Sequence, residues 1–257
     1  MTTCAGIVAA FRRRFALDGR GLVAVVVASI ASGVALVGFS QLADNVSDHD
    51  GLVSGDPGRL AFFVDHRTPG IVEAARGITN LGSFQVLVGV AVLAGVVLWW
   101  RRAQLGLALA PLASLALAAG LTSAVKYMVN RPRPPVYLRL VTENEPSFPS
   151  GHATDSTALY LALGVAAAIV LFRRPLTRAL GIAVGATVGG LVGLSRLVLG
   201  VHWPTDVVAG WALGTAVAVL VVTTSALLVR LDRRHDPARG RPGRWESLVR
   251  MAARTRA

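Results

Sequence analysis

Six stretches of the chain are strongly apolar and carry no charged side chain. They cover residues 21–40, 84–100, 104–125, 157–172, 179–195 and 207–229. A helix needs about 20 apolar residues to cross the hydrocarbon core of a bilayer, and each stretch is near that length. The fourth and fifth are short, but flanking polar residues can continue a helix to the membrane interface. The pattern predicts an all-α integral membrane bundle of about six transmembrane helices.

The segments that flank and separate these stretches divide the chain. The first loop, 41–83, is too long for a simple turn and mixes acidic residues with apolar ones such as Leu60 and Phe63. Such a mixture is typical of short helices at a membrane interface. The tail has prolines and glycines among its arginines, which favours a flexible segment. We therefore expect an N-terminal segment (1–20), one six-span domain (21–229) and a basic tail (230–257).

Composition supports the membrane assignment. Hydrophobic residues make up 53% of the chain and charged residues only 16%, against roughly 45–50% and about 25% in soluble domains. The mean hydropathy is +0.58. A soluble protein of this length has no need for so much apolar sequence.

The net charge of +12 is distributed unevenly between the loops. The N-terminal segment, the turns after the second and fourth stretches and the tail hold 18 of the 26 basic residues but only four of the 14 acidic ones. The positive-inside rule then places both termini in the cytoplasm of a cell whose plasma membrane the chain spans, and the three other loops outside. We expect the basic tail to face solvent or anionic lipid, and we expect no nucleic-acid partner.

Polar residues at the ends of apolar helices are costly to desolvate, so they often mark a functional site. The first such place is the outer end of the third stretch, where Lys126 is followed by Arg133 and Pro134. Lys126 is the single lysine among the 26 basic residues, which argues against an interchangeable surface cation. The alternative is an interfacial anchor that snorkels. Arg131 and Arg139, in the same loop, are expected to be solvated, and the alternative is that they contact a second phosphate or a headgroup.

The second place is the start of the fourth helix, where Pro149, Ser150, Gly151 and His152 follow one another. Ser150 can cap the helix, and glycine lets an anion approach the backbone. The free N–H groups and the positive end of the helix dipole make such a terminus a phosphate site. A capped helix start with an incidental histidine is the alternative.

The third place spans the last outer turn. Ser195 and Arg196 end the fifth helix, His202 precedes the sixth, and Asp206 follows four residues later. Asp206 is close enough in sequence to accept a hydrogen bond from the imidazole. A carboxylate that orients a histidine is the arrangement that nucleophilic or basic histidines require. The alternative is a structural His/Asp pair between helices.

The predicted topology places all three segments on one side of the membrane. Together they supply three cations, the backbone donors of a helix start, two histidines and one carboxylate. Cations beside a helix terminus indicate a phosphate-like oxyanion, and two histidines with one aspartate indicate covalent transfer with acid–base assistance. No cluster of carboxylates or of cysteine and histidine suggests a metal, so we expect no cofactor.

The three segments also have a familiar order and spacing. The patterns K-x6-R-P, P-S-G-H and S-R-x5-H-x3-D begin at residues 126, 149 and 195. This set resembles the type 2 phosphatidic acid phosphatase superfamily, which also contains the vanadium-dependent haloperoxidases. The resemblance covers roughly residues 20–230. It implies a helical-bundle core of that type and a reaction that needs no metal.

The resemblance also assigns roles. His202 would attack phosphorus and form a phosphohistidine, while Asp206 holds its ring. His152 would protonate the leaving oxygen and then activate water. The residues that would bind the phosphoryl oxygens are Lys126, Arg133, Ser150, Gly151 and Arg196.

A phosphate site at the outer edge of a bilayer suits a lipid headgroup whose tails remain in hydrocarbon. We therefore expect a lipid phosphatase of the outer membrane face. Undecaprenyl (polyprenyl) diphosphate is the first candidate substrate, followed by phosphatidylglycerophosphate and phosphatidate. A lipid phosphotransferase and a membrane transporter remain alternatives. A haloperoxidase is disfavoured because most of the chain is membrane spans, and nothing in the sequence indicates an oligomeric state.

Overall fold

The computed structural model describes residues 4–15, 17–101 and 103–235. Within these ranges the chain is helical and contains no strand. The α-helices are α1 (Cys4–Phe15), α2 (Gly19–Asp48), α3 (Asp56–Asp65), α4 (Pro69–Asn80), α5 (Phe84–Trp100), α6 (Leu105–Val129), α7 (Gly151–Val170), α8 (Pro175–Val198) and α9 (Pro204–His235). Two short 3-10 helices, η1 (Gly51–Gly55) and η2 (Val136–Leu138), lie in the loops.

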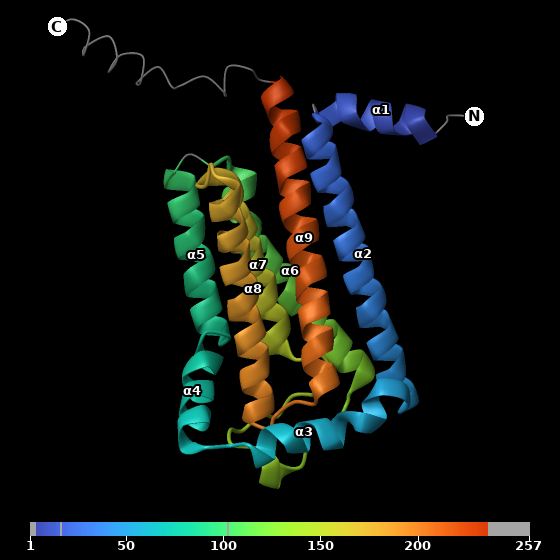
Figure 1. Cartoon of the computed structure of the whole chain (residues 1–257), viewed down its shortest axis with the longest axis vertical. Helices are drawn as coiled ribbons and strands as arrows, with labels where there is room; N and C mark the ends of the chain where they lie inside the picture. Colours follow the sequence, from blue (N-terminus) through green and yellow to red (C-terminus); the bar gives the residue numbers. More distant parts are fainter. Residues whose placement is uncertain (1–3, 16, 102, 236–257) are drawn as a thin grey trace, which may run out of the picture.

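The prediction of about six membrane spans is confirmed. Five described helices, α2, α6, α7, α8 and α9, are long and apolar enough to cross a bilayer. A sixth span is formed if α4 and α5 are counted together, since they pass the same test as a pair bent by 52°. Figure 1 shows the resulting bundle of nearly parallel helices.

Several helices extend beyond the apolar stretches. Helix α2 continues to Asp48, well beyond residue 40, and α7 begins at Gly151, directly after Ser150 as expected, so that Asp155 lies inside the helix. Helix α9 runs to His235, beyond the domain boundary expected at residue 229. The two stretches that looked short belong to helices of 20 and 24 residues. The rest of the predicted tail, residues 236–257, lies outside the described residues.

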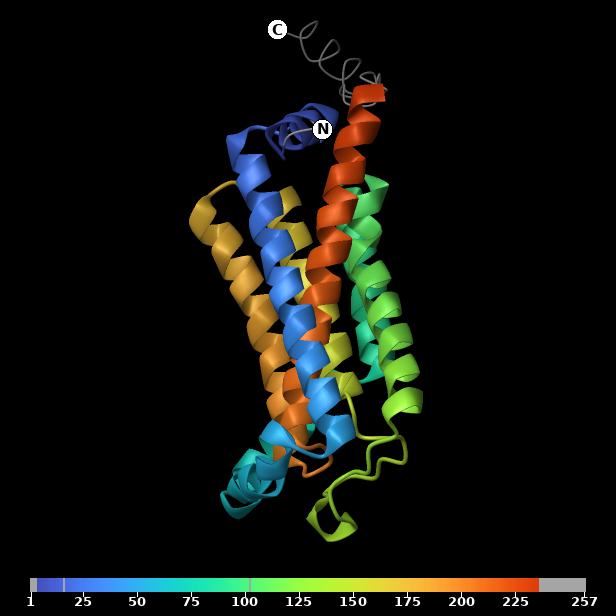
Figure 2. The ribbon, with the colours of Figure 1, turned by 90° about the vertical axis from the view of Figure 1, so that its right-hand side faces the viewer.

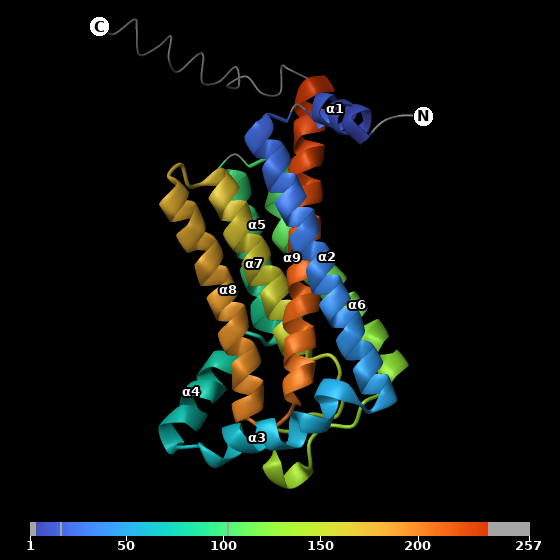
Figure 3. The ribbon, with the colours of Figure 1, turned by 45° about the vertical axis from the view of Figure 1, so that its right-hand side comes forward.

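Helix α7 is the central element of the bundle. It packs against α5, α6, α8 and α9, and 56% of its most apolar window is buried. Helix α2 is peripheral: it packs mainly along α9, and none of its most apolar window is buried by protein (Figure 3). Its apolar side chains are left for lipid.

Glycines allow α7 to approach its neighbours closely. A Cβ added to Gly185 of α8 would lie 2.2 Å from the Tyr160 carbonyl oxygen of α7, and one on Gly214 of α9 would lie 2.5 Å from the Thr154 oxygen. Helices in membranes commonly pack through small residues in this way. The backbones of α7, α8 and α9 therefore touch with no bulky side chain between them.

The loops that carry the polar motifs gather at one end of the bundle (Figure 2). The short helices predicted in the first long loop are present as η1, α3 and α4. They lie at the same end as the loop between α6 and α7, whereas α1 and the last described turn of α9 lie at the opposite end. Helix α3 contacts both α8 and α9, so the first loop is packed against the polar segments.

Candidate functional site

The three polar segments converge at this end. Arg133, from the loop after α6, reaches His202, from the loop before α9, with Nη1 and Nε2 3.1 Å apart. Glu143 links Arg133 to Arg196 at the end of α8. The side chains that act electrostatically on His152, at the start of α7, are Arg196, Glu143, His202 and Arg133. One compact cluster therefore contains residues from all three motifs.

A tight turn positions His202. Gly200 has a φ of 71°, in the left-handed region that glycine adopts without steric cost. A Cβ at this residue would also lie 2.2 Å from the Leu138 carbonyl oxygen. The turn reverses the chain between α8 and α9 and leaves His202 only 1% exposed. Pro204 then starts α9.

Hydrogen bonds determine which nitrogen of His202 is available. Arginine has donors only, so the contact from Arg133 requires a lone pair on Nε2. The proton of the neutral ring is then on Nδ1, which lies 3.4 Å from Asp206 Oδ2. That distance is long for a charge-assisted hydrogen bond, and such contacts often tighten when substrate binds. The ring is thus held with its lone pair on Nε2 and its proton on Nδ1.

The surroundings of His202 also keep the ring neutral. Burial, which disfavours the imidazolium, lowers the pKa of His202 to about 4. The hydrogen bond with Asp206 acts in the opposite direction, and the positive charge of Arg133 adds to the lowering. At neutral pH the ring is therefore unprotonated, as a nucleophile must be.

Asp206 is itself held by several donors. Its Oδ2 accepts a hydrogen bond from the Trp203 backbone N–H at 2.9 Å and another from the Ser147 hydroxyl. Its Oδ1 accepts from Arg131. The carboxylate is completely buried, so these donors replace water and fix the plane in which it faces His202.

The three predicted phosphate-binding cations each face an acidic side chain. Arg133 and Arg196 both pair with Glu143, and Lys126 lies 3.4 Å from Glu145. Burial alone would raise the pKa of Glu143, but the two guanidinium groups lower it, so this carboxyl is ionised. The cations therefore already bind anionic oxygens, and a phosphate that enters the cluster must exchange with carboxylates.

The start of α7 lies beside these cations. Ser150 occupies the N-cap position, but its hydroxyl makes no capping hydrogen bond, contrary to the expectation from the sequence. That hydroxyl is buried and has no partner among the described residues, and the same is true of Nε of Arg196. Buried donors without partners are rare in proteins and are consistent with a bound oxyanion. Gly151 follows as the first helical residue and leaves the backbone accessible on that side.

Sequence reasoning missed several residues of this site, among them Arg131 and Asp56. Arg131, expected to be solvated, is only 9% exposed and pairs with both Asp206 and Asp56. Asp56, from α3, lies 75 residues before Arg131 and is 1% exposed. No local sequence pattern predicts an ion pair between residues 75 positions apart. The only sequence feature that could have indicated this ion pair is the position of Arg131, two residues before Arg133 in a proline-rich loop.

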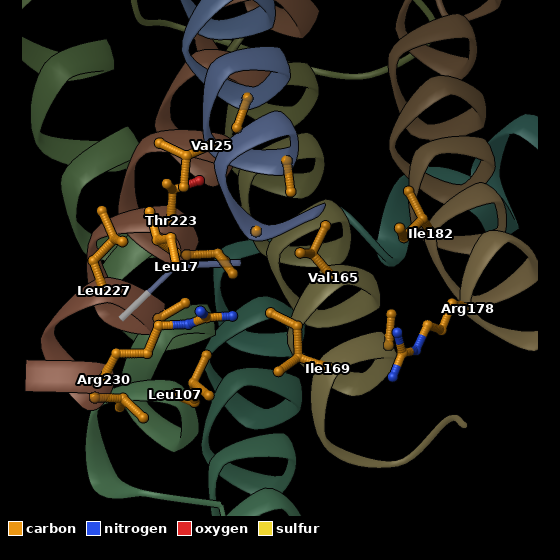
Figure 4. A pocket seen from close by; sticks show the side chains of 17 residues that line it. Leu17, Val25, Leu107, Val165, Ile169, Arg178, Ile182, Thr223, Leu227 and Arg230 are labelled. Carbon is orange, nitrogen blue, oxygen red and sulfur yellow. The ribbon is translucent and has the colours of Figure 1, made fainter. Parts of the chain in front are cut away.

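One cavity between the described helices lies apart from this cluster. It has a volume of about 560 Å³ and lies toward the opposite end of the bundle (Figure 4). Apolar residues of α2, α7 and α9 form its walls, with Arg178 and Arg230 among its lining. It contains no histidine or carboxylate, so the chemistry belongs to the polar cluster and not to this cavity.

The polar cluster holds donors suited to an oxyanion. Among residues 4–15, 17–101 and 103–235, no three His, Cys, Asp or Glu side chains are grouped as metal ligands. The groups that converge are instead one ammonium, three guanidinium groups, two imidazoles and a helix terminus. This combination can bind a phosphoryl group, attack it and transfer a proton.

Comparison with known protein families gives one match to this region. The model of the PAP2 superfamily matches residues 107–230. Among curated proteins, the decaprenylphosphoryl-5-phosphoribose phosphatase of Mycobacterium tuberculosis is 31% identical over 60% of the chain and 80% of its own length. Phosphatidylglycerophosphatase B of Bacillus subtilis is 31% identical over 60% and 75%. An undecaprenyl-diphosphatase of Sulfolobus acidocaldarius is 32% identical over 52% and 62%.

Two solved structures are similar to the chain. A transmembrane PAP2 type phosphatidylglycerolphosphate phosphatase from Bacillus subtilis superposes with a TM-score of 0.69 at 29% identity, over 74% of this chain and 93% of that one. LpxE from Aquifex aeolicus superposes with a TM-score of 0.51 at 21% identity, over 65% and 94%. At that lower identity the second likeness concerns the fold alone.

Proposed function

The chain belongs to the PAP2 superfamily and is a lipid phosphatase embedded in a membrane, and on this basis we propose that it hydrolyses a lipid phosphate through a phosphohistidine on His202. The observation that carries the proposal is the environment of His202. Its Nε2 faces Arg133, and its Nδ1 faces a buried carboxylate. The nucleophilic atom is therefore directed at a group of cations that suits a phosphoryl group.

The proposed reaction has two steps. First, His202 Nε2 attacks phosphorus while Arg133 and Arg196 stabilise the phosphoryl oxygens. The bond from phosphorus to the lipid oxygen breaks, and His152 gives a proton to that oxygen. Second, His152 takes a proton from water, the water oxygen attacks phosphorus, and phosphate leaves His202. Asp206 stabilises the positive charge on the His202 ring in both steps.

We place the site at the outer membrane face. The loops that carry the motifs share one end of the bundle, and α1 and the end of α9 share the other. Of the arginine-rich segments, the described parts at α1, after α5 and between α7 and α8 lie at the second end. The positive-inside rule assigns that end to the cytoplasm and supports a substrate headgroup bound at the outer surface.

Undecaprenyl (polyprenyl) diphosphate is our first candidate substrate. Similar proteins named for activity on undecaprenyl diphosphate and on a decaprenylphosphoryl sugar phosphate support a polyprenyl lipid. Similarity to phosphatidylglycerophosphatase B supports phosphatidylglycerophosphate as the alternative, followed by phosphatidate. All of these lipids present a terminal phosphoryl group on a long apolar tail.

Phosphate release from purified protein tests the function. The protein in detergent should release phosphate from at least one of these lipids, and EDTA should leave the rate unchanged because the proposed steps use only protein groups. Vanadate, which resembles the phosphoryl group in the transition state of its transfer, should inhibit phosphate release. A failure to release phosphate from every one of the lipids, or a rate abolished by EDTA and restored by a metal ion, would contradict the proposal.

The pH dependence of kcat/KM provides a second test. His202 must be unprotonated to attack, and its pKa is lowered to about 4 by burial. The acid limb due to His202 should therefore lie near pH 4, with loss of activity as the pH falls through that value. A profile corrected for the ionisation of the free substrate would measure it. If the acid limb due to His202 lay near the ordinary histidine pKa of about 6.5, the result would contradict the buried environment described for this ring.

A further inference from the structure

We propose that Asp56 of α3 and Arg131 are positioning residues for the His202 nucleophile, acting through Asp206, an inference that rests on the function proposed above. Neither residue is one of the specified positions of the three motifs, although Arg131 lies at a variable position inside K-x6-R-P. Asp56 also lies outside residues 107–230, the part of the chain that the family model matches. The proposal gives the first long loop a function in the reaction.

Arg131 connects the two carboxylates. Its Nη1 donates to Asp206 Oδ1 and, at 2.8 Å, to the Thr205 hydroxyl oxygen. Its Nη2 donates to Asp56 Oδ2 at 2.7 Å. The guanidinium carbon lies 5.7 Å from the centre of the Trp203 ring. These contacts fix the guanidinium plane, so Asp206 has a single orientation available when it faces His202.

Asp56 completes the arrangement from the other side. It is almost fully buried and accepts four hydrogen bonds, two on each oxygen. Oδ1 receives the Thr205 N–H at 3.2 Å and Arg59 at 3.3 Å, whereas Oδ2 receives Arg131 and the Thr205 hydroxyl. Through Thr205, Asp56 also holds the first turn of α9, the turn that carries Asp206.

Charges alternate along this chain of contacts. Arg59, Asp56, Arg131 and Asp206 form a row of cation, anion, cation and anion that ends at His202. If Arg131 paired with Asp206 alone, the Asp206 carboxylate would be a weaker hydrogen-bond acceptor for the His202 imidazole. Because Asp56 takes part of the Arg131 charge, Asp206 keeps more of its capacity to stabilise the imidazolium. Orientation and charge thus act on the same atom of His202.

Asparagine cannot replace Asp56 in this setting. All four partners of Asp56 are donors, and asparagine has one acceptor oxygen and one NH₂ group. In either orientation the NH₂ group would face two donors. We expect Asp56→Asn to lower kcat roughly 10- to 100-fold, the scale of loss when a reacting group is misplaced by about 1 Å. KM should change little, because no member of the row binds the phosphoryl oxygens.

Asp65→Asn is a matched control. Asp65 ends the same helix, is exposed, and forms no hydrogen bond or ion pair with any residue that the structure describes. The same chemical change at that residue should leave kcat and KM at wild-type values. A comparable fall in both variants would mean that α3 is merely sensitive to substitution, and it would overturn the inference.

A double variant separates positioning from folding. Arg131→Gln alone leaves two buried carboxylates without their shared cation and can fail to fold. Asp56→Asn combined with Arg131→Gln removes one charge of each sign and should fold. We expect its kcat to remain low, close to that of Asp56→Asn alone, because both changes disable one unit. Recovery of wild-type kcat in the double variant would show that the pair serves folding only and would overturn the inference.

An NMR titration of the His202 ring gives a readout that needs no substrate. Asp206 faces the ring from α9, Arg133 and Ser147 from the loop after α6, Arg196 from α8 and His152 from α7. All five are retained in the variants. Asp56→Asn removes a negative charge and should lower the pKa of His202, whereas Arg131→Gln removes a positive charge and should raise it. A pKa unchanged by Asp56→Asn overturns the inference.

The outcomes distinguish this inference from the proposed function. If wild-type protein releases phosphate, His202→Ala does not, and Asp56→Asn keeps kcat within about threefold, the function stands and the inference fails. If wild-type protein releases no phosphate from any lipid, the function fails, and the NMR titration still decides whether Asp56 and Arg131 act on His202.

Discussion

Replacing His202 with alanine is expected to remove phosphate release almost completely while the protein stays folded. The loss should be roughly 10⁴- to 10⁶-fold in kcat, because the covalent route disappears with its nucleophile. Folding should persist because Asp206 keeps the donors Arg131, Ser147 and the Trp203 N–H after the ring is removed. No buried charge is then left without a partner.

Trapping the phosphoenzyme measures this directly. Substrate labelled in its terminal phosphate is mixed with enzyme and quenched under conditions that preserve phosphohistidine, and the labelled residue is mapped. Wild-type protein should carry the label on His202, and the alanine variant should carry none. His66→Ala is the matched control, since His66 is exposed at the end of α3. A label on any other residue, or an active His202→Ala variant, would refute the mechanism.

Replacing His152 with alanine should have the second largest effect, about 10²- to 10⁴-fold in kcat, the usual contribution of a general acid or base. The effect should depend on the leaving group. A lipid phosphate leaving from a diphosphate is a weak base and departs without full protonation, whereas the alkoxide of a monoester needs the proton. With a diphosphate the first step should survive and the second should slow, so that phospho-His202 accumulates.

The same labelling experiment reads this out. His152→Ala given a labelled diphosphate should retain label on His202 for longer than wild-type protein does. Given a labelled monoester, the variant should form little phosphoenzyme. If the His152→Ala variant turned over both lipids at the wild-type rate, His152 would be excluded as the acid and base. Equal accumulation from both would show that His152 acts on water alone.

The hydrophobic pattern was sufficient for the bundle but not for its helix ends. Apolar runs located all the spans, because a transmembrane helix satisfies its backbone hydrogen bonds within one continuous apolar segment. The apolar runs end before the helices do where polar residues continue a helix, as they do between residue 40 and Asp48 in α2. Charge runs mark where hydrocarbon ends, and a helix can extend beyond that point into the headgroup region.

The candidate site was predictable where its residues are close in sequence and unpredictable where they are not. His202 and Asp206 are four residues apart on one turn, so their contact follows from local geometry. Asp56 meets Thr205 across 149 residues, and Glu143 meets Arg196 across 53. Such pairs depend on how α3 and the loop before α7 fold over the bundle, which the pattern of apolar residues does not encode.

The glycine contacts between α7, α8 and α9 have an evolutionary consequence. These helices touch backbone to backbone at Gly185 and Gly214, so substitutions there are confined to very small residues. The packed helices that carry His152, Arg196 and Asp206 therefore tolerate few substitutions. Helix α2, whose most apolar window is not buried by protein, tolerates more. Selection for a new lipid can remodel the periphery while the reaction centre is inherited intact.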